Sequence, residues 1–133
     1  MLVIFTDGAS LGNPGPMGIG IVIYRDSMRV EELSEYLGEG TNNIAEYTAI
    51  IKALQTAHRM GEMEVHIKSD SQLVIRQLNN EYKVKDPTLK SLKRKIEKLC
   101  TSMKVFFEHI PRERNEEADN LAKEAAMRGK ARP

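Results

Sequence analysis

Residues Leu2–Ile23 read LVIFTDGASLGNPGPMGIGIVI, and this stretch decides the fold of the chain. Its first four residues are apolar and rich in β-formers, which is typical of a strand buried on both faces. After Asp7-Gly8 the sequence is dominated by Gly and Pro, so the backbone turns there without forming a helix. A second apolar run, Ile19–Tyr24, follows at hairpin distance. We therefore predict an antiparallel hairpin that holds Asp7 rigidly at the end of a central strand.

Length and composition indicate one ordinary globular domain. The chain has 133 residues, of which 41% are hydrophobic and 29% charged, and its net charge of +1 gives no global electrostatic case for binding nucleic acid. The single cysteine excludes an internal disulfide and fits a reducing compartment. No apolar run approaches the ~20 residues of a membrane span. We expect a cytoplasmic protein without a membrane segment or an obligate protein partner, with a catalytic domain over 1–128 and a polar tail over 129–133.

The remaining elements follow from apolar periodicity and from capping residues. Loose alternation over Arg29–Leu37 predicts a third, more exposed strand. Apolar residues at three- and four-residue spacing predict a helix from about Asn43, its expected N-cap, to Gly61. The later elements are a strand at Val65–Lys68, a short helix over Leu73–Leu78, a helix opened by Asp86-Pro87, a strand at Met103–Ile110 and a helix capped by Asn115.

This order of elements predicts an α/β fold with a five-stranded mixed sheet flanked by about four helices. The first three strands form an antiparallel meander. The last two strands arrive by helical crossovers, so they should lie parallel to the first. In such a sheet the carboxyl ends of the strands and the amino ends of the helices that follow share one edge.

Four acidic residues are expected at that edge: Asp7, Glu46, Asp70 and Asp119. Asp7 and Asp70 end strands, whereas Glu46 and Asp119 lie in the first turns of helices. Each acid alone has an ordinary explanation as a turn, cap, capping-box or helix-dipole residue. Together, however, they would repel one another without a compensating cation. Oxygen ligands without His or Cys favour Mg²⁺ or Mn²⁺, and two such ions roughly 4 Å apart can promote phosphodiester cleavage.

Four sequence blocks lie in order along essentially the whole chain. They read TDGASLGNPGP from Thr6, TNNIAE from Thr41, SDSQ from Ser69 and NEEADNLA from Asn115. These blocks resemble the signatures of type 1 ribonuclease H, and four ordered blocks are far more specific than any one alone. The resemblance implies a ribonuclease H-like fold and Mg²⁺-dependent endonucleolytic hydrolysis of the RNA strand of RNA/DNA hybrids. It also implies products with 5′-phosphate and 3′-hydroxyl ends.

The resemblance further implies roles for particular residues. Catalysis and the binding of two Mg²⁺ ions, with Mn²⁺ as a substitute, fall to Asp7, Glu46, Asp70 and Asp119. In the family, residues near the first block and the Thr-Asn-Asn block contact 2′-hydroxyls, minor-groove base edges and phosphate of the substrate. These contacts fit the rule that the 2′-hydroxyl distinguishes RNA from DNA. The substrate-binding positions are Gly8, Ala9, Asn13, Thr41, Asn42, Asn43 and Gln72.

The chain departs from the family pattern before the last acid. Many members carry a mobile histidine there, but the loop Ile110–Asn115 has none. His109 lies just upstream and is more simply explained as a packed or surface residue of the last strand. The charged loop residues Arg112, Glu113 and Arg114 are the other candidates for the helper role.

A basic insertion that some members use to grip the DNA strand is also absent, because Asn79–Leu89 is too short for it. What remains is a basic face on the following helix, where Lys90, Arg94 and Lys98 lie four residues apart. A solvated face opposite the apolar side and a phosphate-binding face are equally good explanations. Aromatic residues make up only 5% of the chain, so base-stacking platforms are not evident.

Two other features are assigned structural roles. Gly15, Gly18 and Gly20 lack the G-x-G-x-x-G order of a nucleotide-binding loop and are followed by a strand, so they indicate a hairpin turn. Cys100 follows Leu99 on the apolar side of its helix and is expected to be a core thiol.

Two alternatives to hybrid cleavage stay open. The first is a binding module that grips hybrid or structured nucleic acid without cutting it, although such a module would have no need of four mutually repelling acids. The second keeps the metal chemistry and changes the substrate to double-stranded RNA or an RNA 3′ end. Comparing cleavage of a hybrid with cleavage of an RNA duplex separates this second alternative from the main prediction.

Overall fold

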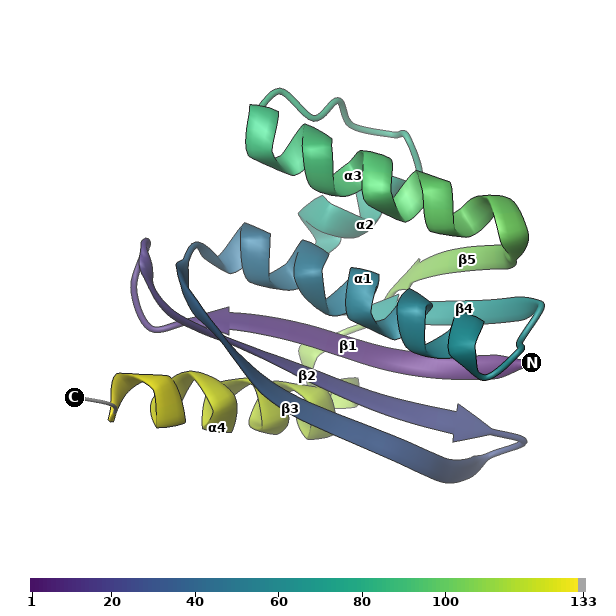
Figure 1. Ribbon diagram of the computed structural model, residues 1–133, viewed down its shortest axis with the longest axis horizontal. Coiled ribbons are helices and arrows are strands. Elements are labelled where there is room, and N and C mark those ends of the chain that lie inside the picture. Colours follow the sequence, from purple (N-terminus) through teal and green to yellow (C-terminus); the bar gives the residue numbers. More distant parts are fainter. Residues whose placement is uncertain (132–133) are drawn as a thin grey trace.

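The computed structural model describes residues 1–131 and consists of one mixed sheet between two layers of helices (Figure 1). The strands are β1 (Leu2–Ser10), β2 (Gly15–Arg25), β3 (Met28–Gly40), β4 (Glu64–Ser69) and β5 (Lys104–His109). The helices are α1 (Asn42–Arg59), α2 (Gln72–Leu78), α3 (Pro87–Leu99) and α4 (Glu116–Lys130), with short 3₁₀ helices η1 (Cys100–Ser102) and η2 (Arg112–Arg114). The strand order is β3-β2-β1-β4-β5. β1, β2 and β3 pair antiparallel and β4 and β5 run parallel to β1, which confirms the predicted topology.

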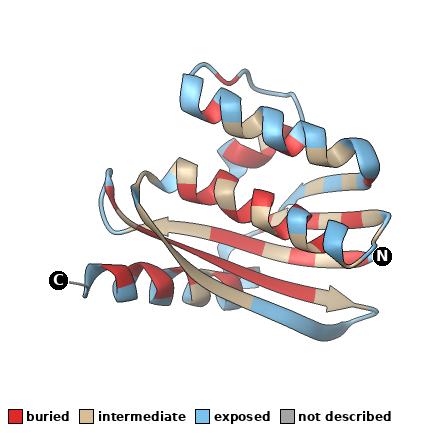
Figure 2. Ribbon diagram, viewed as in Figure 1, coloured by how far each residue is buried: buried red, intermediate tan, exposed pale blue. Residues whose placement is uncertain are grey.

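The upper layer of helices encloses the main hydrophobic core. In Figure 1, α1, α2 and α3 lie above the sheet, and the sides of α1 and of the strands that face each other are buried (Figure 2). Large aliphatic side chains such as Ile4, Ile50 and Ile67 fill this interface, and each contributes roughly 1.5–3 kcal/mol by burial. Cys100 packs against the same core, as predicted.

The lower layer is α4 alone, and it lies against β2 at two glycines. A Cβ atom at Gly18 would come within 2.2 Å of the Ala122 carbonyl oxygen, and one at Gly20 within 2.1 Å of the Ala118 carbonyl oxygen. Both glycines lie inside β2 rather than in the predicted turn. Their missing side chains let the helix backbone touch the strand, which sets the position of α4.

β1 is longer than its apolar run predicts. It continues through Asp7 to Ser10 because β2 pairs with it along its whole length. The parallel partner β4 pairs only with Leu2–Phe5. Asp7 therefore lies inside an antiparallel ladder, at the point where the parallel ladder has just ended. The Asp7 backbone is paired with β2 on one side. On its other side there is no strand partner, and the residues directly after β4 lie there.

The carboxyl-terminal helix extends into the segment expected to be a polar tail. α4 includes Gly129 and Lys130, and Gly129 is buried. Its missing side chain makes room for the Tyr36 ring, since a Cβ there would lie 1.9 Å from that ring. Residues 132 and 133 of the expected tail lie outside the described residues. Within 1–131, no helix combines the length and the apolar character needed to cross a bilayer.

Candidate active site

Three of the four predicted acids meet at the sheet edge where β4 ends. Asp7 on β1, Glu46 on α1 and Asp70 directly after β4 each offer a carboxylate oxygen, and these oxygens all lie within 4.8 Å of one another. The register explains the meeting, because Phe5 pairs with Lys68, and Asp7 and Asp70 each come two residues after this pair. Asp7 is 5% exposed and Glu46 is 7% exposed. The result is a largely buried carboxylate cluster.

Glu46 reaches the cluster because α1 lies directly against Gly8. A Cβ atom at Gly8 would be 2.3 Å from the Ala45 carbonyl carbon, so only glycine permits this approach. The Gly8 amide donates to Glu46 Oε1 at 2.5 Å, and the Ser69 hydroxyl donates to Oε2 at 3.3 Å. The sheet therefore holds the Glu46 carboxylate through two hydrogen bonds.

The start of α1 differs from the prediction. Thr41, not Asn43, is the N-cap, and its hydroxyl oxygen accepts a hydrogen bond from the Ile44 amide at 3.3 Å. Glu46 is consequently in the second turn of the helix rather than the first. The capping-box explanation for Glu46 is excluded, because the glutamate of a capping box lies three residues after the N-cap. With Thr41 as the cap, Ile44 occupies that position.

The capping explanation for Asp70 is also excluded. Ser71 caps α2, since its hydroxyl oxygen accepts from the Val74 amide at 3.4 Å. The Ser71 amide in turn donates to the Ser69 hydroxyl oxygen at 3.1 Å. Two serines thus organise the backbone around Asp70, and its carboxylate is left to the cluster.

Asp119 lies in the first turn of α4, as predicted, but outside the close group of three. Its carboxylate is 3.0 Å from the Lys123 ammonium on the next turn of the same helix. The start of α4 is tied to β1 by Asn115, whose side-chain amide donates to the Thr6 carbonyl at 2.9 Å. Asp119 still faces the other acids across a cleft of about 300 Å³. The cleft is lined by Asp7, Gly8, Asn42, Asn43, Glu46, Asp70, Ser71, Arg112 and Asp119.

Burial and neighbouring negative charges raise the pKa of two of the acids, Asp7 and Glu46. Burial is the largest cause of the raised pKa of Asp7, and the negative charges of Glu46, Asp70 and Asp119 raise it further. Burial also raises the pKa of Glu46, against hydrogen bonds that favour its charged form. A hard divalent cation would bind the ionised carboxylates in place of these protons and relieve the repulsion. The donor set therefore fits Mg²⁺ or Mn²⁺.

Several predicted substrate contacts gather at the cleft. Gly8, Asn42 and Asn43 line it directly. Asn13 is joined to them, since its side-chain oxygen accepts from the Asn42 amide at 3.1 Å. The Ser10 amide donates to the Asn42 side-chain oxygen at 2.7 Å. Ser10 was not among the predicted contacts, although it follows Ala9 in the first signature block.

The other predicted contacts have different positions. Thr41 caps α1 next to Asn42. Ala9 lies on β1 opposite Gly18, and Gln72 is the exposed first residue of α2. None of these three lines the cleft among the described residues.

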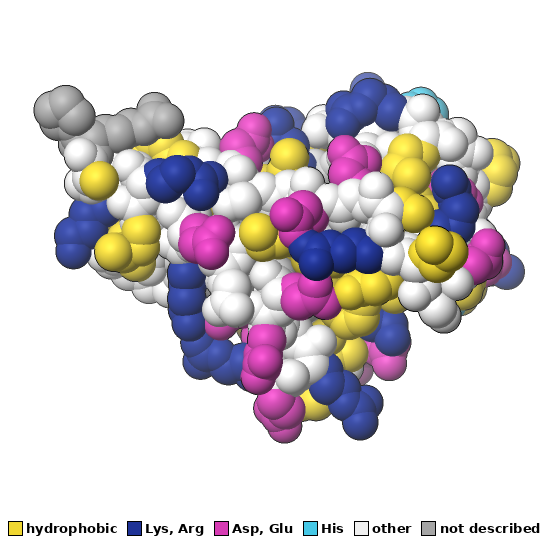
Figure 3. All heavy atoms as spheres, turned by 90° about the horizontal axis from the view of Figure 1, so that it is seen from below, with side chains coloured by type: hydrophobic (Ala, Val, Ile, Leu, Met, Phe, Trp, Pro, Cys, Tyr) yellow, Lys and Arg dark blue, Asp and Glu magenta, His cyan; other side chains and the backbone are white. Residues whose placement is uncertain are grey.

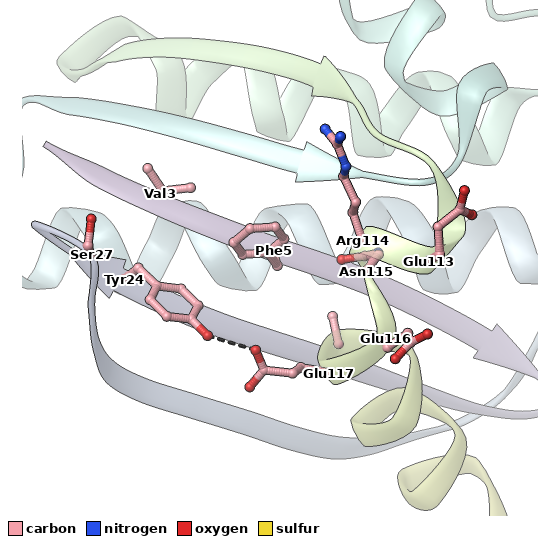
Figure 4. A pocket seen from close by; sticks show the side chains of 10 residues that line it. Val3, Phe5, Tyr24, Ser27, Glu113, Arg114, Asn115, Glu116 and Glu117 are labelled. Carbon is pink, nitrogen blue, oxygen red and sulfur yellow. Dashed lines mark hydrogen bonds between the residues drawn. The ribbon is translucent and has the colours of Figure 1, made fainter.

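The candidate helpers separate into different places. Arg112 lines the acid cleft, whereas Arg114 lines a second cavity, beside Phe5 and Tyr24 (Figure 4). Glu113 borders that second cavity as well. His109 is the exposed last residue of β5 and pairs with Ser69, and it does not line the acid cleft.

The predicted basic face is on the outer side of the upper layer. Lys90, Arg94 and Lys98 are exposed along α3, while Leu89 and Ile96 on the opposite side are buried. α3 packs on α1, which carries Glu46. The helix that carries the basic face thus packs directly on α1, the helix that supplies one of the clustered acids.

Known relatives match the chain over nearly all of its length. A family model described as reverse transcriptase-like matches residues 5–125. The chain is 40% identical to ribonuclease HI of Halobacterium salinarum over 91% of its own length and 62% of that protein. It is 35% identical to ribonuclease H of Syntrophus aciditrophicus, over 96% of its own length and 81% of that protein. It spans about a third of the length of three mycobacterial relatives, 35% in each case.

A solved structure shows the same arrangement of elements. The crystal structure of LC11-RNase H1, a protein isolated from compost, in complex with an RNA/DNA hybrid superimposes with a TM-score of 0.93. Its sequence is 43% identical, and the match covers 98% of this chain and 100% of that one.

Proposed function

The chain belongs to the type 1 ribonuclease H family, and from this premise we propose that it is an endonuclease that hydrolyses the RNA strand of RNA/DNA hybrids. The observation that carries the proposal is the cluster of three carboxylates whose oxygens lie within 4.8 Å of one another. A hybrid-bound neighbour of the same fold supports the choice of substrate. A cytoplasmic location, expected from the single cysteine, is part of the proposal.

Asp7, Glu46, Asp70 and Asp119 would hold two Mg²⁺ ions, for which Mn²⁺ can substitute. The donor set supports this assignment, because it consists of carboxylate oxygens without His or Cys. When bound, the ions would supply an activated water and stabilisation of the departing 3′-oxygen, which gives 5′-phosphate and 3′-hydroxyl ends. The protein contributes a cluster that is built before the metal arrives, since Gly8 and Ser69 already orient Glu46.

Amide groups around the cleft would recognise the hybrid. Asn42 and Asn43 line the cleft, and a carboxamide can both donate and accept hydrogen bonds. This suits the 2′-hydroxyl and the base edges of the minor groove. Asn13 would hold Asn42 in place, because the two are already hydrogen-bonded. Substrate contacts are also assigned to Gly8, Ala9, Thr41 and Gln72.

Basic residues would act on phosphates. Arg112 is the helper that we favour over His109 and Arg114, because it lines the cleft with the acids. Its guanidinium can hold a phosphate oxygen in a charge-assisted hydrogen bond. Lys90, Arg94 and Lys98 would contact backbone phosphates farther along the substrate.

Cleavage of a labelled RNA/DNA hybrid in Mg²⁺ tests the proposal. The same RNA as a single strand and as an RNA duplex should run beside it, with and without a chelator. We expect internal cuts in the hybrid alone, abolished by the chelator and by Asp70→Asn. Glu124→Gln, an exposed acid on α4 outside the cleft, is the matched control and should cut normally. Binding without cutting in any divalent metal would indicate a binding module instead, and efficient cutting of the RNA duplex would change the substrate class.

A further inference from the structure

A groove lies between the carboxyl-terminal halves of α1 and α3, which pack on each other in the upper layer of helices (Figure 1). Its volume is about 340 Å³. His58 in the groove follows Glu46 by more than three turns of α1, which is roughly 18 Å along the helix axis. Within residues 1–131, the groove and the acid cleft share no lining residue. Binding in the groove is therefore separable from cleavage.

The floor of the groove is apolar. Ile51 from α1 and Leu99 from α3 line it, where Ile51 belongs to the main hydrophobic core and Leu99 packs against that core. The methylene stems of Lys95 and Lys98 extend this apolar surface at the sides. An apolar side chain of a ligand would leave water on entering the groove, which favours binding.

The rim of the groove is cationic. Lys95, Lys98 and His58 are exposed there, and none of these three side chains has an ion-pair or hydrogen-bond partner among residues 1–131. In the described part of the chain, no carboxylate lines the groove. The α4 face of the molecule differs, because Figure 3 shows acidic and basic side chains interspersed there. The groove thus combines uncompensated positive charge with an apolar floor.

Helix dipoles explain only part of this arrangement. His58 and Lys98 lie in the last turns of α1 and α3, where cations are stabilising. Lys95 lies about one turn earlier in α3, beyond the short range of that effect. A dipole also requires neither a groove nor an apolar floor. The combination of features indicates a ligand that is both anionic and apolar.

We propose that this groove binds an acidic peptide segment of a partner protein. An apolar side chain of the segment would rest on Ile51 and Leu99, and its carboxylates would contact Lys95 and Lys98. Phosphates of a nucleic acid would also suit the lysines, and Lys98 is among the side chains assigned to phosphate contacts. A sugar–phosphate backbone, however, has no large apolar group for the floor. Among the described residues, no Phe, Tyr or Trp lines the groove to stack on a base.

Fluorescence anisotropy with a short labelled peptide, in which pairs of glutamates alternate with pairs of leucines, tests the proposal on the full chain. We expect a Kd of about 10–100 µM that weakens as salt is raised. Two control peptides, one with serine for leucine and one with glutamine for glutamate, should each bind at least about tenfold more weakly. In ¹⁵N-labelled protein the amide shifts should centre on Ile51, His58 and Leu99.

Substitutions at Gln55, an exposed α1 residue that lines the groove, locate the site without disturbing the core. Gln55→Glu should weaken peptide binding about three- to tenfold, and Gln55→Lys should strengthen it about two- to threefold, because only the charge in the groove changes sign. Lys95→Glu should weaken binding at least about tenfold. Lys130→Glu makes the same charge change on α4, away from the groove, and should bind the peptide normally.

Several results would overturn the proposal, whatever the cleavage assay shows. These are equal binding of the three peptides, no amide shifts up to about 1 mM peptide, and effects of Gln55→Glu and Gln55→Lys in the same direction. Displacement of the peptide by an RNA/DNA hybrid in chelator, with larger shifts at the same amides, would assign the groove to nucleic acid instead.

Discussion

Helices α1 and α4 each bring one acid to the cleft, but they hold it in different ways. α1 presses its backbone against Gly8, and the sheet hydrogen-bonds the Glu46 carboxylate. α4 also lies on glycines of the sheet, yet the Asp119 carboxylate pairs with Lys123 on its own helix. Glu46 belongs to the close group of three oxygens, and Asp119 does not.

The difference separates a fixed inner set of acids from an adjustable outer one. Asp7, Glu46 and Asp70 are positioned by strand register and by backbone contact, so their geometry exists before any ligand binds. Asp119 must exchange its lysine partner to join them. Preorganised ligands lose less free energy on binding than ligands that must rearrange. We therefore expect the inner set to determine metal affinity and the outer acid to adjust it.

The largest effect should come from neutralising an inner acid. Asp70→Asn is expected to lower hybrid cleavage in Mg²⁺ by at least about 10³-fold, or about 4 kcal/mol in the barrier. Asp119→Asn should cost less, about 10- to 100-fold, because an amide oxygen can still serve an outer position. Single-turnover cleavage of the same hybrid measures both, and equal losses would erase the distinction between inner and outer acids.

Replacing a glycine by alanine at each helix contact tests whether α1 and α4 position their acids differently. Gly8→Ala and Gly20→Ala both force a Cβ into helix backbone, and each should destabilise the protein by about 1–3 kcal/mol in thermal unfolding. Only Gly8→Ala displaces Glu46, so only that variant should also lose most of the increase in melting temperature that Mg²⁺ gives. A normal Mg²⁺ response in Gly8→Ala would show that α1 contact does not position the cluster.

The inner set should also make the metal-free protein sensitive to pH. The pKa of Asp7 is raised on folding, so above about pH 4 the folded state binds more protons than the unfolded state. The stability contributed by this group is fully present below that pH and is lost as pH rises through the raised pKa. Asp7→Asn should therefore stabilise the metal-free protein at pH 8 by about 1–2 kcal/mol. Chemical unfolding at pH 5 and pH 8 in chelator checks this, and an equal gain at both pH values would contradict it.

The smallest effect concerns the partner of the outer acid. Lys123 is half exposed, and exposed ion pairs contribute no more than about 1 kcal/mol. Lys123→Met releases Asp119 and should lower the Mg²⁺ concentration for half-maximal cleavage by about two- to threefold. A tenfold or larger change in either direction would mean that Lys123 touches the substrate instead.

The sheet topology and the meeting of Asp7 with Asp70 were predictable from the sequence for a physical reason. Strand order follows from apolar runs and helical crossovers, and parallel strands bring their carboxyl ends to one edge. The pairing of Asp119 with Lys123 also had a signal, since residues four apart on a helix are neighbours. Local pattern and chain connectivity are sufficient for such features.

Features that depend on contacts between distant segments could not be predicted. Thr41, Asn42 and Asn43 are all residue types that favour an N-cap, so the local sequence did not identify Thr41 as the one that caps α1. The low aromatic content hid the second cavity, because Phe5 and Tyr24 meet only through the pairing of β1 with β2. These positions depend on tertiary geometry that no local spacing encodes.

The hydrogen bond from the Gly8 amide to Glu46 gives the site a spectroscopic reporter. That amide proton is shielded from solvent only while the carboxylate accepts it, so its exchange rate follows the state of Glu46. Protonation of Glu46, or its recruitment by a cation, would change both the exchange rate and the proton chemical shift. A single backbone resonance can therefore follow occupancy of the cleft in real time, without substrate and without a label on any catalytic group.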